Sequence, residues 1–121
     1  MRRPERMAEV LREEISEIVG YELEDPRLSA VTVTDVKVSP DLRDANIYVL
    51  VEGDENEKRR AMSALDRASN FVRRQVALNL DLHHAPVLHF ARDTVEENAS
   101  RIEEVLKELS EEENNNITEE L

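Results

Sequence analysis

The segment that most constrains the architecture is VTVTDVKVSPDLRDANIYVLV, residues 31–51. Two runs rich in β-branched residues flank a polar stretch, residues 39–44, that has good turn chemistry. We therefore predict an antiparallel hairpin. Within the first run the valines change parity between Val33 and Val36, and one extra residue would return both to the same face. This change of parity predicts a β-bulge at Thr34–Asp35.

Apolar periodicity predicts four further elements, which are helices over residues 3–20, 55–80 and 94–109 and a short strand over residues 87–91. Asp54 and Glu57 resemble a capping box at the start of the second helix. The last strand is reached through a helix, so it can pair parallel to a neighbour. The order helix, strand, strand, helix, strand, helix predicts the α+β class, with helices on one face of a small sheet.

The length of 121 residues fits one domain with one core. The chain shows neither an internal repeat nor a boundary to a second domain. We place a single domain at residues 1–109. From residue 110 the composition is acidic and polar, and we expect residues 110–121 to form a disordered tail.

The composition leaves little room for enzymatic chemistry. The chain has no cysteine and only two glycines, Gly20 and Gly53, which excludes thiolate sites, a P-loop and a GxGxxG motif. The three histidines lack the spacing of a metal site, and no nucleophile has a matched base. We expect no enzyme activity, no catalytic residue, no cofactor and no metal. Because neither a signal-peptide pattern nor a membrane-spanning apolar run is present, we expect a cytoplasmic protein without membrane association.

Charge is distributed unevenly along the chain. The net charge of −12 argues against generic nucleic-acid binding, which depends on neutralising phosphates. Residues 58–74 nevertheless carry six basic residues and one acid, whereas residues 96–121 carry two basic residues and ten acids. Because physiological salt screens exposed charges over about 8 Å, the basic stretch acts largely independently of distant acids. The overall sign of the charge therefore does not decide whether the protein binds RNA.

The basic stretch contains a weak point for a helix. Ser69 occupies a position at which the apolar stripe should continue, and Asn70 follows it. Both side chains compete with the helix backbone for hydrogen bonds. We predict that the helix is interrupted here, with Asn70 at or near positive φ, and that the new helix N-terminus binds an anion between Arg67 and Arg73. The alternative is an ordinary solvated helix face that carries these arginines.

Three strings, VTVTDVKVSPDLRDANIYV, ALDRASNFVRRQVALNL and PVLHFARD, resemble the ribosome-binding factor A family of bacteria, as does the opening RPERMAEVLREEISEIV. The resemblance covers residues 2–109. It implies a type II KH-like fold, with a mixed three-stranded sheet packed against helices. The chain lacks the GxxG loop of ordinary KH domains. The family's Ala-x-Gly turn corresponds to Ala68-Ser69-Asn70, in which Asn70 replaces the glycine.

The resemblance also implies a function. Family members bind the immature small (30S) ribosomal subunit and its 16S rRNA, assist late maturation and growth in the cold, and leave with the help of a GTPase. We therefore expect a monomer whose partners are the 30S subunit, 16S rRNA and GTPase assembly factors. The candidate RNA-binding residues are Arg2, Arg3, Arg6, Lys58, Arg59, Arg60, Arg67, Ala68, Ser69, Asn70, Arg73 and Arg74.

A second functional hypothesis stays open at this point. In it the protein is an adaptor whose acidic hairpin and acidic tail contact a basic ribosomal protein, and contact with RNA is incidental. A salt titration of RNA binding separates the two hypotheses, because neutralisation of phosphates predicts a steep negative slope.

Overall fold

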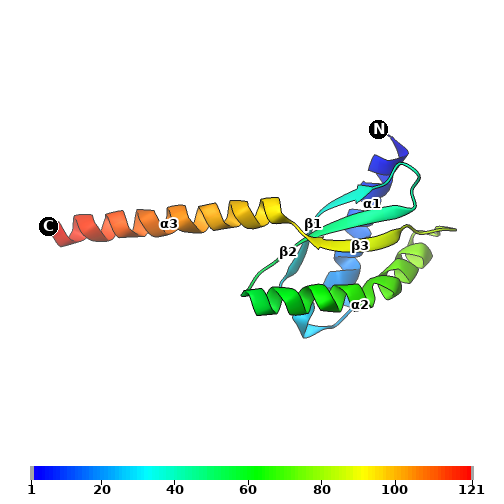
Figure 1. Ribbon diagram of the computed structural model, residues 1–121, viewed down its shortest axis with the longest axis horizontal. Coiled ribbons are helices and arrows are strands. Elements are labelled where there is room, and N and C mark those ends of the chain that lie inside the picture. The colour runs from blue at the N-terminus through cyan, green and yellow to red at the C-terminus, as the bar shows by residue number, and fades with distance from the viewer. Residues whose placement is uncertain (1, 121) are drawn as a thin grey trace.

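The structure is a computed structural model that describes residues 2–120. Its elements, in chain order, are α1 (Arg3–Glu17), the π-helical turn η1 (Ile18–Glu22), the 3-10 turn η2 (Pro26–Leu28), β1 (Val31–Val38), β2 (Asp44–Val51), α2 (Glu55–Asn79), β3 (Val87–Arg92) and α3 (Thr94–Glu120) (Figure 1). This order confirms the predicted α+β class. The helical path of the first segment continues past Gly20, where the sequence predicted an end, because η1 follows α1 directly.

The three strands form one mixed sheet in the order β1-β2-β3. β1 and β2 are antiparallel and β2 and β3 are parallel, which confirms both the hairpin and the parallel third strand. The register shifts between Val33 and Asp35, so that Thr34 is the extra residue of the predicted bulge. Val33 and Val36 are both buried as a result.

Helices α1 and α2 cover one face of the sheet. α1 lies mainly against β1, and α2 lies mainly against β3. The largest fully buried side chains are Leu11, Ile15, Ile18, Ile47, Val49, Leu65, Val72, Val76 and Pro86. The capping box at the start of α2 is confirmed, because the Glu57 N–H donates to Asp54 Oδ1 at 2.8 Å. α2 therefore begins at a defined residue, with one side in the core and the other in solvent.

α2 remains helical across the predicted weak point. The helix is continuous over Glu55–Asn79, and Asn70 is not among the residues with positive φ, so the predicted interruption is wrong. Leu65 and Val72 are fully buried on either side of the weak point. This packing outweighs the local preferences of Ser69 and Asn70, because tertiary contacts supply most of the stability of a helix in a protein.

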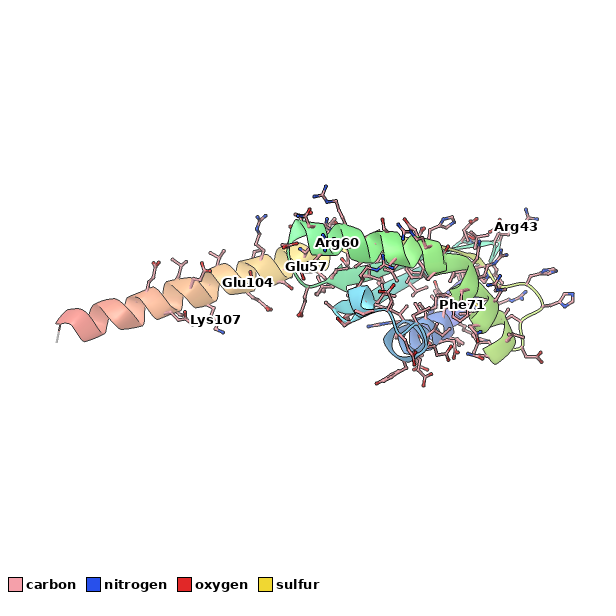
Figure 2. All side chains as sticks on the ribbon, turned by 90° about the horizontal axis from the view of Figure 1, so that it is seen from below. Arg43, Glu57, Arg60, Phe71, Glu104 and Lys107 are labelled. Atoms are coloured by element: carbon pink, nitrogen blue, oxygen red, sulfur yellow. The ribbon has the colours of Figure 1, made fainter. Side chains whose placement is uncertain are left out.

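The ribbon of α2 nevertheless changes direction near Phe71 (Figure 2). Ser69 Oγ donates to the carbonyl oxygen of Asp66 at 2.8 Å. A hydroxyl that bonds back to the preceding turn competes for that carbonyl and often bends the helix. The sequence thus located the irregularity correctly but not its form, which is a bend within a helix.

α3 is the second long helix, and it extends away from the body of the molecule (Figure 1). Every side chain from Arg101 to Glu113 is exposed. The sequence predicted a disordered tail from residue 110, whereas α3 continues to Glu120. The segment after Leu109 contains neither glycine nor proline, and glutamate is a good helix former. An established helix propagates through the run Glu111 to Glu113 at little cost.

Candidate nucleic-acid interface

The solvent side of α2 carries a row of arginines. Arg60, Arg67 and Arg74 are exposed and recur every seven residues, so that they leave the same side of the helix. Figure 2 shows Arg60 on the side of α2 that faces away from the sheet. At 1.5 Å per residue, these three residues extend over about 21 Å of helix. We call Arg60, Arg67 and Arg74 the arginine row.

Phe71 lies within this row and was missed by the sequence interpretation. Its side chain is 37% exposed. It follows Arg67 by four residues and precedes Arg74 by three, which are neighbouring positions on a helix surface. Unpaired RNA bases stack on aromatic rings and on guanidinium planes. The sequence contained a signal for this residue, because Phe71 is an aromatic residue that lies among arginines and outside the apolar stripe.

The three residues of the predicted turn differ in exposure. Ala68 packs against the core, and the hydroxyl of Ser69 is bonded to Asp66. Asn70 is exposed, between Arg67 and Arg74 in the sequence. Of these three residues, Asn70 is therefore the one whose side chain can contact a ligand at the outer surface.

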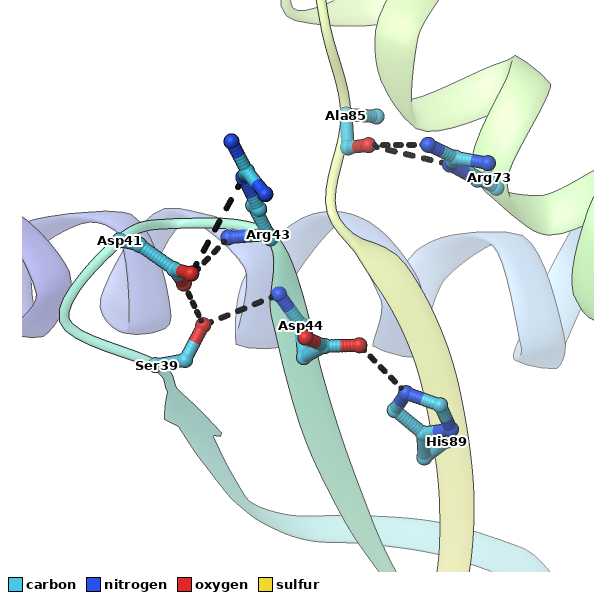
Figure 3. A network of polar contacts seen from close by, with 7 residues as sticks. All are labelled: Ser39, Asp41, Arg43, Asp44, Arg73, Ala85 and His89. Atoms are coloured by element: carbon cyan, nitrogen blue, oxygen red, sulfur yellow. Dashed lines mark hydrogen bonds and ion pairs between the residues drawn. The ribbon is translucent and has the colours of Figure 1, made fainter.

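Arg73 has a different position from its neighbours. Its Nε and Nη2 atoms donate to the carbonyl oxygen of Ala85 at 3.0 and 2.8 Å (Figure 3). Ala85 is buried just before β3, so Arg73 ties α2 to the start of that strand. The structure therefore does not gather Arg67 and Arg73 around a helix N-terminus. The N-terminus on which the predicted anion site depended does not form, because α2 is continuous.

The cations at the start of α2 face different surroundings. Lys58 is half-buried and lines a polar cleft of about 680 Å³ between the start of α2 and the first turns of α3. Arg59 is exposed and donates to Asn56 Oδ1 at 2.6 Å. The pKa of Asp54 is lowered mainly by the Glu57 N–H of the capping box, with a smaller contribution from the charge of Arg60. Lys58 thus belongs to the junction with α3, whereas Arg59 and Arg60 face solvent.

Arg67 lies near the η2 turn. The pKa of Asp25 is lowered mainly by hydrogen bonds from Arg27, and the charge of Arg67 lowers it further. Arg27 Nη2 lies 2.7 Å from Asp25 Oδ2. Arg67 therefore lies beside an Arg27–Asp25 ion pair, which the sequence interpretation did not include.

The N-terminal candidates lie at the other end of α2. Arg3 and Arg6 line a shallow apolar groove of about 370 Å³ together with Leu80 and Leu82, which follow α2. Arg2 is exposed just before them. The fold thus brings the beginning of the chain to the end of α2. Arg2, Arg3 and Arg6 form a second basic group there, separate from Arg59 and Arg60.

The acidic residues of the hairpin are held in local contacts (Figure 3). Asp41 accepts a hydrogen bond from Ser39 Oγ at 2.7 Å, and this bond is the main cause of its lowered pKa. Asp44 Oδ1 lies 2.9 Å from His89 Nε2. Asp41 and Asp44 are thus held in place by contacts within the domain, while both side chains stay more than half exposed.

Among the side chains that the structure describes, those of residues 2–113, no three or more from histidine, aspartate or glutamate are grouped as metal ligands. Within residues 2–120, none of the helices combines the length and the apolar character needed to cross a membrane. The fold and its surface define a small α+β binding domain whose long basic helix suits an extended polyanion.

The chain matches the family model described as ribosome-binding factor A over residues 3–106. It is 43% identical over 106 residues to ribosome-binding factor A of Solibacter usitatus, a match that covers 88% of this chain and 86% of the relative. The chain belongs to the ribosome-binding factor A family. The family resemblance drawn from the sequence is therefore confirmed.

Solved structures of this family share the fold. The crystal structure of ribosome-binding factor A from Thermus thermophilus matches with a TM-score of 0.66 at 28% identity, over 74% of this chain and 94% of that one. A homology model of the Thermus thermophilus protein, fitted into a cryo-EM map of its complex with the 30S subunit, matches with a TM-score of 0.57 at 30% identity. That match covers 68% of this chain and 86% of the fitted one. The family consists of ribosome assembly factors that are not enzymes, which agrees with the expectation for this chain.

Proposed function

We propose that this protein binds the immature small ribosomal subunit through contacts of the arginine row with 16S rRNA. It assists late maturation of the subunit in the cytoplasm and supports growth in the cold. The observation that carries the proposal is the arginine row itself, three exposed arginines on a helix whose opposite side is fixed in the core. The 30S complex of the Thermus thermophilus relative supports the same assignment.

The net charge of −12 does not oppose RNA binding, because much of the excess of acids lies at residues 96–121, which carry ten acids and two basic residues. The glutamates of α3 extend away from the body, whereas the arginine row lies on α2 (Figure 1). Charges separated by more than about 8 Å are largely screened in physiological salt. The guanidinium fork of arginine matches the geometry of phosphate oxygens, so the row presents three phosphate-binding groups.

Phe71 favours a particular kind of RNA at the arginine row. In an A-form duplex the bases are stacked on one another, whereas those of loops, bulges and ends are free to stack on protein side chains. A partly exposed ring flanked by Arg67 and Arg74 suits one such base between two phosphate contacts. The contacted segment of 16S rRNA therefore contains at least one unpaired base.

The remaining candidates take supporting parts in this proposal. Additional phosphate contacts come from Arg59 and Asn70 on α2 and from the N-terminal group of Arg2, Arg3 and Arg6, whereas Lys58 faces the cleft beside α3. Ala68, Ser69 and Arg73 shape and position α2 without contacting RNA. From the family resemblance alone, we further propose that the protein acts as a monomer and that GTPase assembly factors promote its release.

The test is binding to immature 30S subunits over a salt series, with the parent chain and the triple variant Arg60→Ala/Arg67→Ala/Arg74→Ala. Each phosphate contact contributes about 0.7 to 0.9 to the slope of log K against log salt. The triple variant is expected to bind more weakly and to lose a slope of about two units or more. Its melting temperature should stay close to that of the parent, because exposed substitutions usually change stability by no more than about 0.5 kcal/mol each.

A matched control separates the site from a general charge effect. The triple variant Arg12→Ala/Arg43→Ala/Arg101→Ala removes three exposed arginines from other surfaces and changes the net charge equally. It should retain the parent's affinity and slope. If both triple variants lose the same slope, or if neither does, the arginine row is an ordinary solvated helix face and the proposal fails.

A further inference from the structure

α3 carries an apolar stripe that the rest of the described chain leaves open. Its members repeat at intervals of four and three, the spacing of a coiled-coil seam. They are Val95, Ala99, Ile102, Leu106 and Leu109, which we call the α3 stripe. Ile102 is 60% exposed, Leu106 59% and Leu109 51%. Single exposed apolar residues are ordinary, but a continuous seam of this kind marks an interaction surface.

The base of α3 is fixed to the body by an arginine. Arg92, at the end of β3, donates from Nη1 to Glu55 Oε2 of α2 at 3.0 Å. The Nε of the same guanidinium donates to Glu97 Oε1 in the first turn of α3 at 2.6 Å. One side chain therefore links β3, α2 and α3. Two carboxylates, one from α2 and one from α3, bind the same guanidinium. This junction therefore fixes the direction in which α3 leaves the body.

The bulge in β1 contributes a second contact at the base. Asp93 Oδ1 accepts the N–H of Glu96 at 3.0 Å, which caps the start of α3. Asp93 Oδ2 accepts the hydroxyl of Thr34, the extra residue of the bulge. A β-bulge re-aims a side chain, and here it aims Thr34 at the cap of α3. α3 is thus held out from the body as an arm (Figure 1).

One flank of the α3 stripe is acidic. Residues 94–113 contain eight glutamates, against Arg101 and Lys107. Glu96 and Glu103 directly follow stripe residues and therefore border the seam. A second copy of α3 offers no cation at the positions that border the seam, and in an antiparallel pair it would place Glu96 and Glu103 opposite glutamates, which is unfavourable.

We propose that the α3 stripe docks an amphipathic helix of another protein, in which apolar residues at heptad spacing are bordered by lysines and arginines. The apolar residues bury the seam, and the basic residues pair with Glu96 and Glu103. This activity goes beyond RNA binding by the arginine row, since it uses another helix and the opposite charge. The family model ends at residue 106, whereas α3 continues to Glu120, so part of this arm lies outside the matched region.

The test uses two labelled synthetic helices of about three heptads with leucine at the seam positions. One has lysine at the bordering positions and the other has glutamate there. Fluorescence anisotropy with the full chain is expected to show binding of the lysine peptide only. The double variant Ile102→Ser/Leu106→Ser should weaken that binding at least tenfold. The control is Leu78→Ser, which removes an exposed leucine from α2 and should leave binding unchanged.

A second pair of variants tests the charge requirement without altering the stripe. It tests the proposal even if the serine substitutions in the first variant unfold part of α3. Glu96→Gln/Glu103→Gln should weaken binding several-fold at low salt and have little effect at high salt. Glu104→Gln/Glu111→Gln, on the other side of the helix, is the matched control and should have a smaller effect. Equal binding of the two peptides, or full binding by both test variants, would overturn the proposal. So would a stripe-dependent dimer of the parent chain in sedimentation analysis, since a second copy would then be the occupant.

Discussion

α2 and α3 are helices of similar length, 25 and 27 residues, but the apolar side of α2 is buried whereas that of α3 is exposed. In α2, Leu65 and Val72 are fully buried and the outer side is basic. In α3, Ile102 and Leu106 are more than half exposed and one flank is acidic. Apolar periodicity therefore identifies a helix face that a partner must cover, while topology determines whether the same chain supplies that partner. The chain must return from α2 to pair β3 beside β2, which carries α2 across the sheet.

The largest expected effect contrasts a leucine from each helix. Leu65→Ala should lower the free energy of unfolding by about 2–5 kcal/mol, because it removes buried methyl groups and leaves a cavity. Leu106→Ala removes the same atoms from an exposed position and should change it by no more than about 0.5 kcal/mol. Urea denaturation of the two variants measures both values. Equal destabilisation would mean that α3 packs on the body in solution.

The next effect contrasts two adjacent arginines within α2. Arg73→Ala should destabilise the protein by about 1–3 kcal/mol, because it leaves the carbonyl of buried Ala85 without its donor. Arg74→Ala should leave stability nearly unchanged but weaken binding to immature 30S subunits. Denaturation and binding are measured on both variants. The opposite assignment, with Arg73 needed for binding and Arg74 for stability, would contradict the positions described for them.

A smaller effect concerns pH at the base of α3. The hydroxyl of Thr34, and next the N–H of Glu96, lower the pKa of Asp93 below its ordinary value of 3.8. Because the folded-state pKa is depressed, the stabilisation by ionised Asp93 is complete above the ordinary pKa. It is lost as pH falls through the depressed one. Acid should therefore loosen the start of α3.

An NMR titration of the Asp93 carboxyl measures this directly. Thr34→Val removes the hydroxyl and should move the Asp93 pKa back towards 3.8, whereas Thr34→Ser should retain the depressed value. An Asp93 pKa that is the same in all three proteins would show that the bulge does not reach the cap of α3.

The smallest expected effect is on deletion of residues 111–121. The described side chains of this segment, Glu111 to Glu113, are exposed, so the melting temperature should change little. Removal of these acidic residues should change binding by the arginine row little, because the end of α3 extends away from the body and charges more than about 8 Å apart are largely screened. A calorimetric scan and a binding curve of the truncated chain test both statements. A large loss of thermal stability would show that the end of α3 is part of the fold.

The sequence carried the signals for the sheet because those signals are local. The valines of 31–38 change parity, and that change alone located the bulge at Thr34. The bend in α2 was placed correctly, but its form depends on Leu65 and Val72 packing on the sheet, which local preferences do not report. The element order and the family resemblance were sufficient for the fold.

Less of the candidate nucleic-acid interface could be predicted from the sequence. The role of Arg73 depends on the backbone carbonyl of Ala85. Because every residue has a backbone carbonyl, the sequence does not indicate which one Arg73 binds. The Arg27–Asp25 ion pair comes close to Arg67 through the η2 turn, which is distant in sequence from α2. Phe71 was available from the pattern, since it lies between arginines and outside the apolar stripe. Tertiary contacts thus separate the arginines that hold α2 in place from those that face solvent.

One experiment tests the proposed roles of both helices. A photo-crosslinking amino acid replaces either Phe71 or Ile102 in the full chain, which is then bound to immature 30S subunits. The products are separated into RNA and protein adducts and identified. The account predicts that the probe at Phe71 attaches to 16S rRNA and that the probe at Ile102 attaches to a basic helix of another protein. Protein adducts alone at Phe71, or rRNA adducts alone at Ile102, would contradict it.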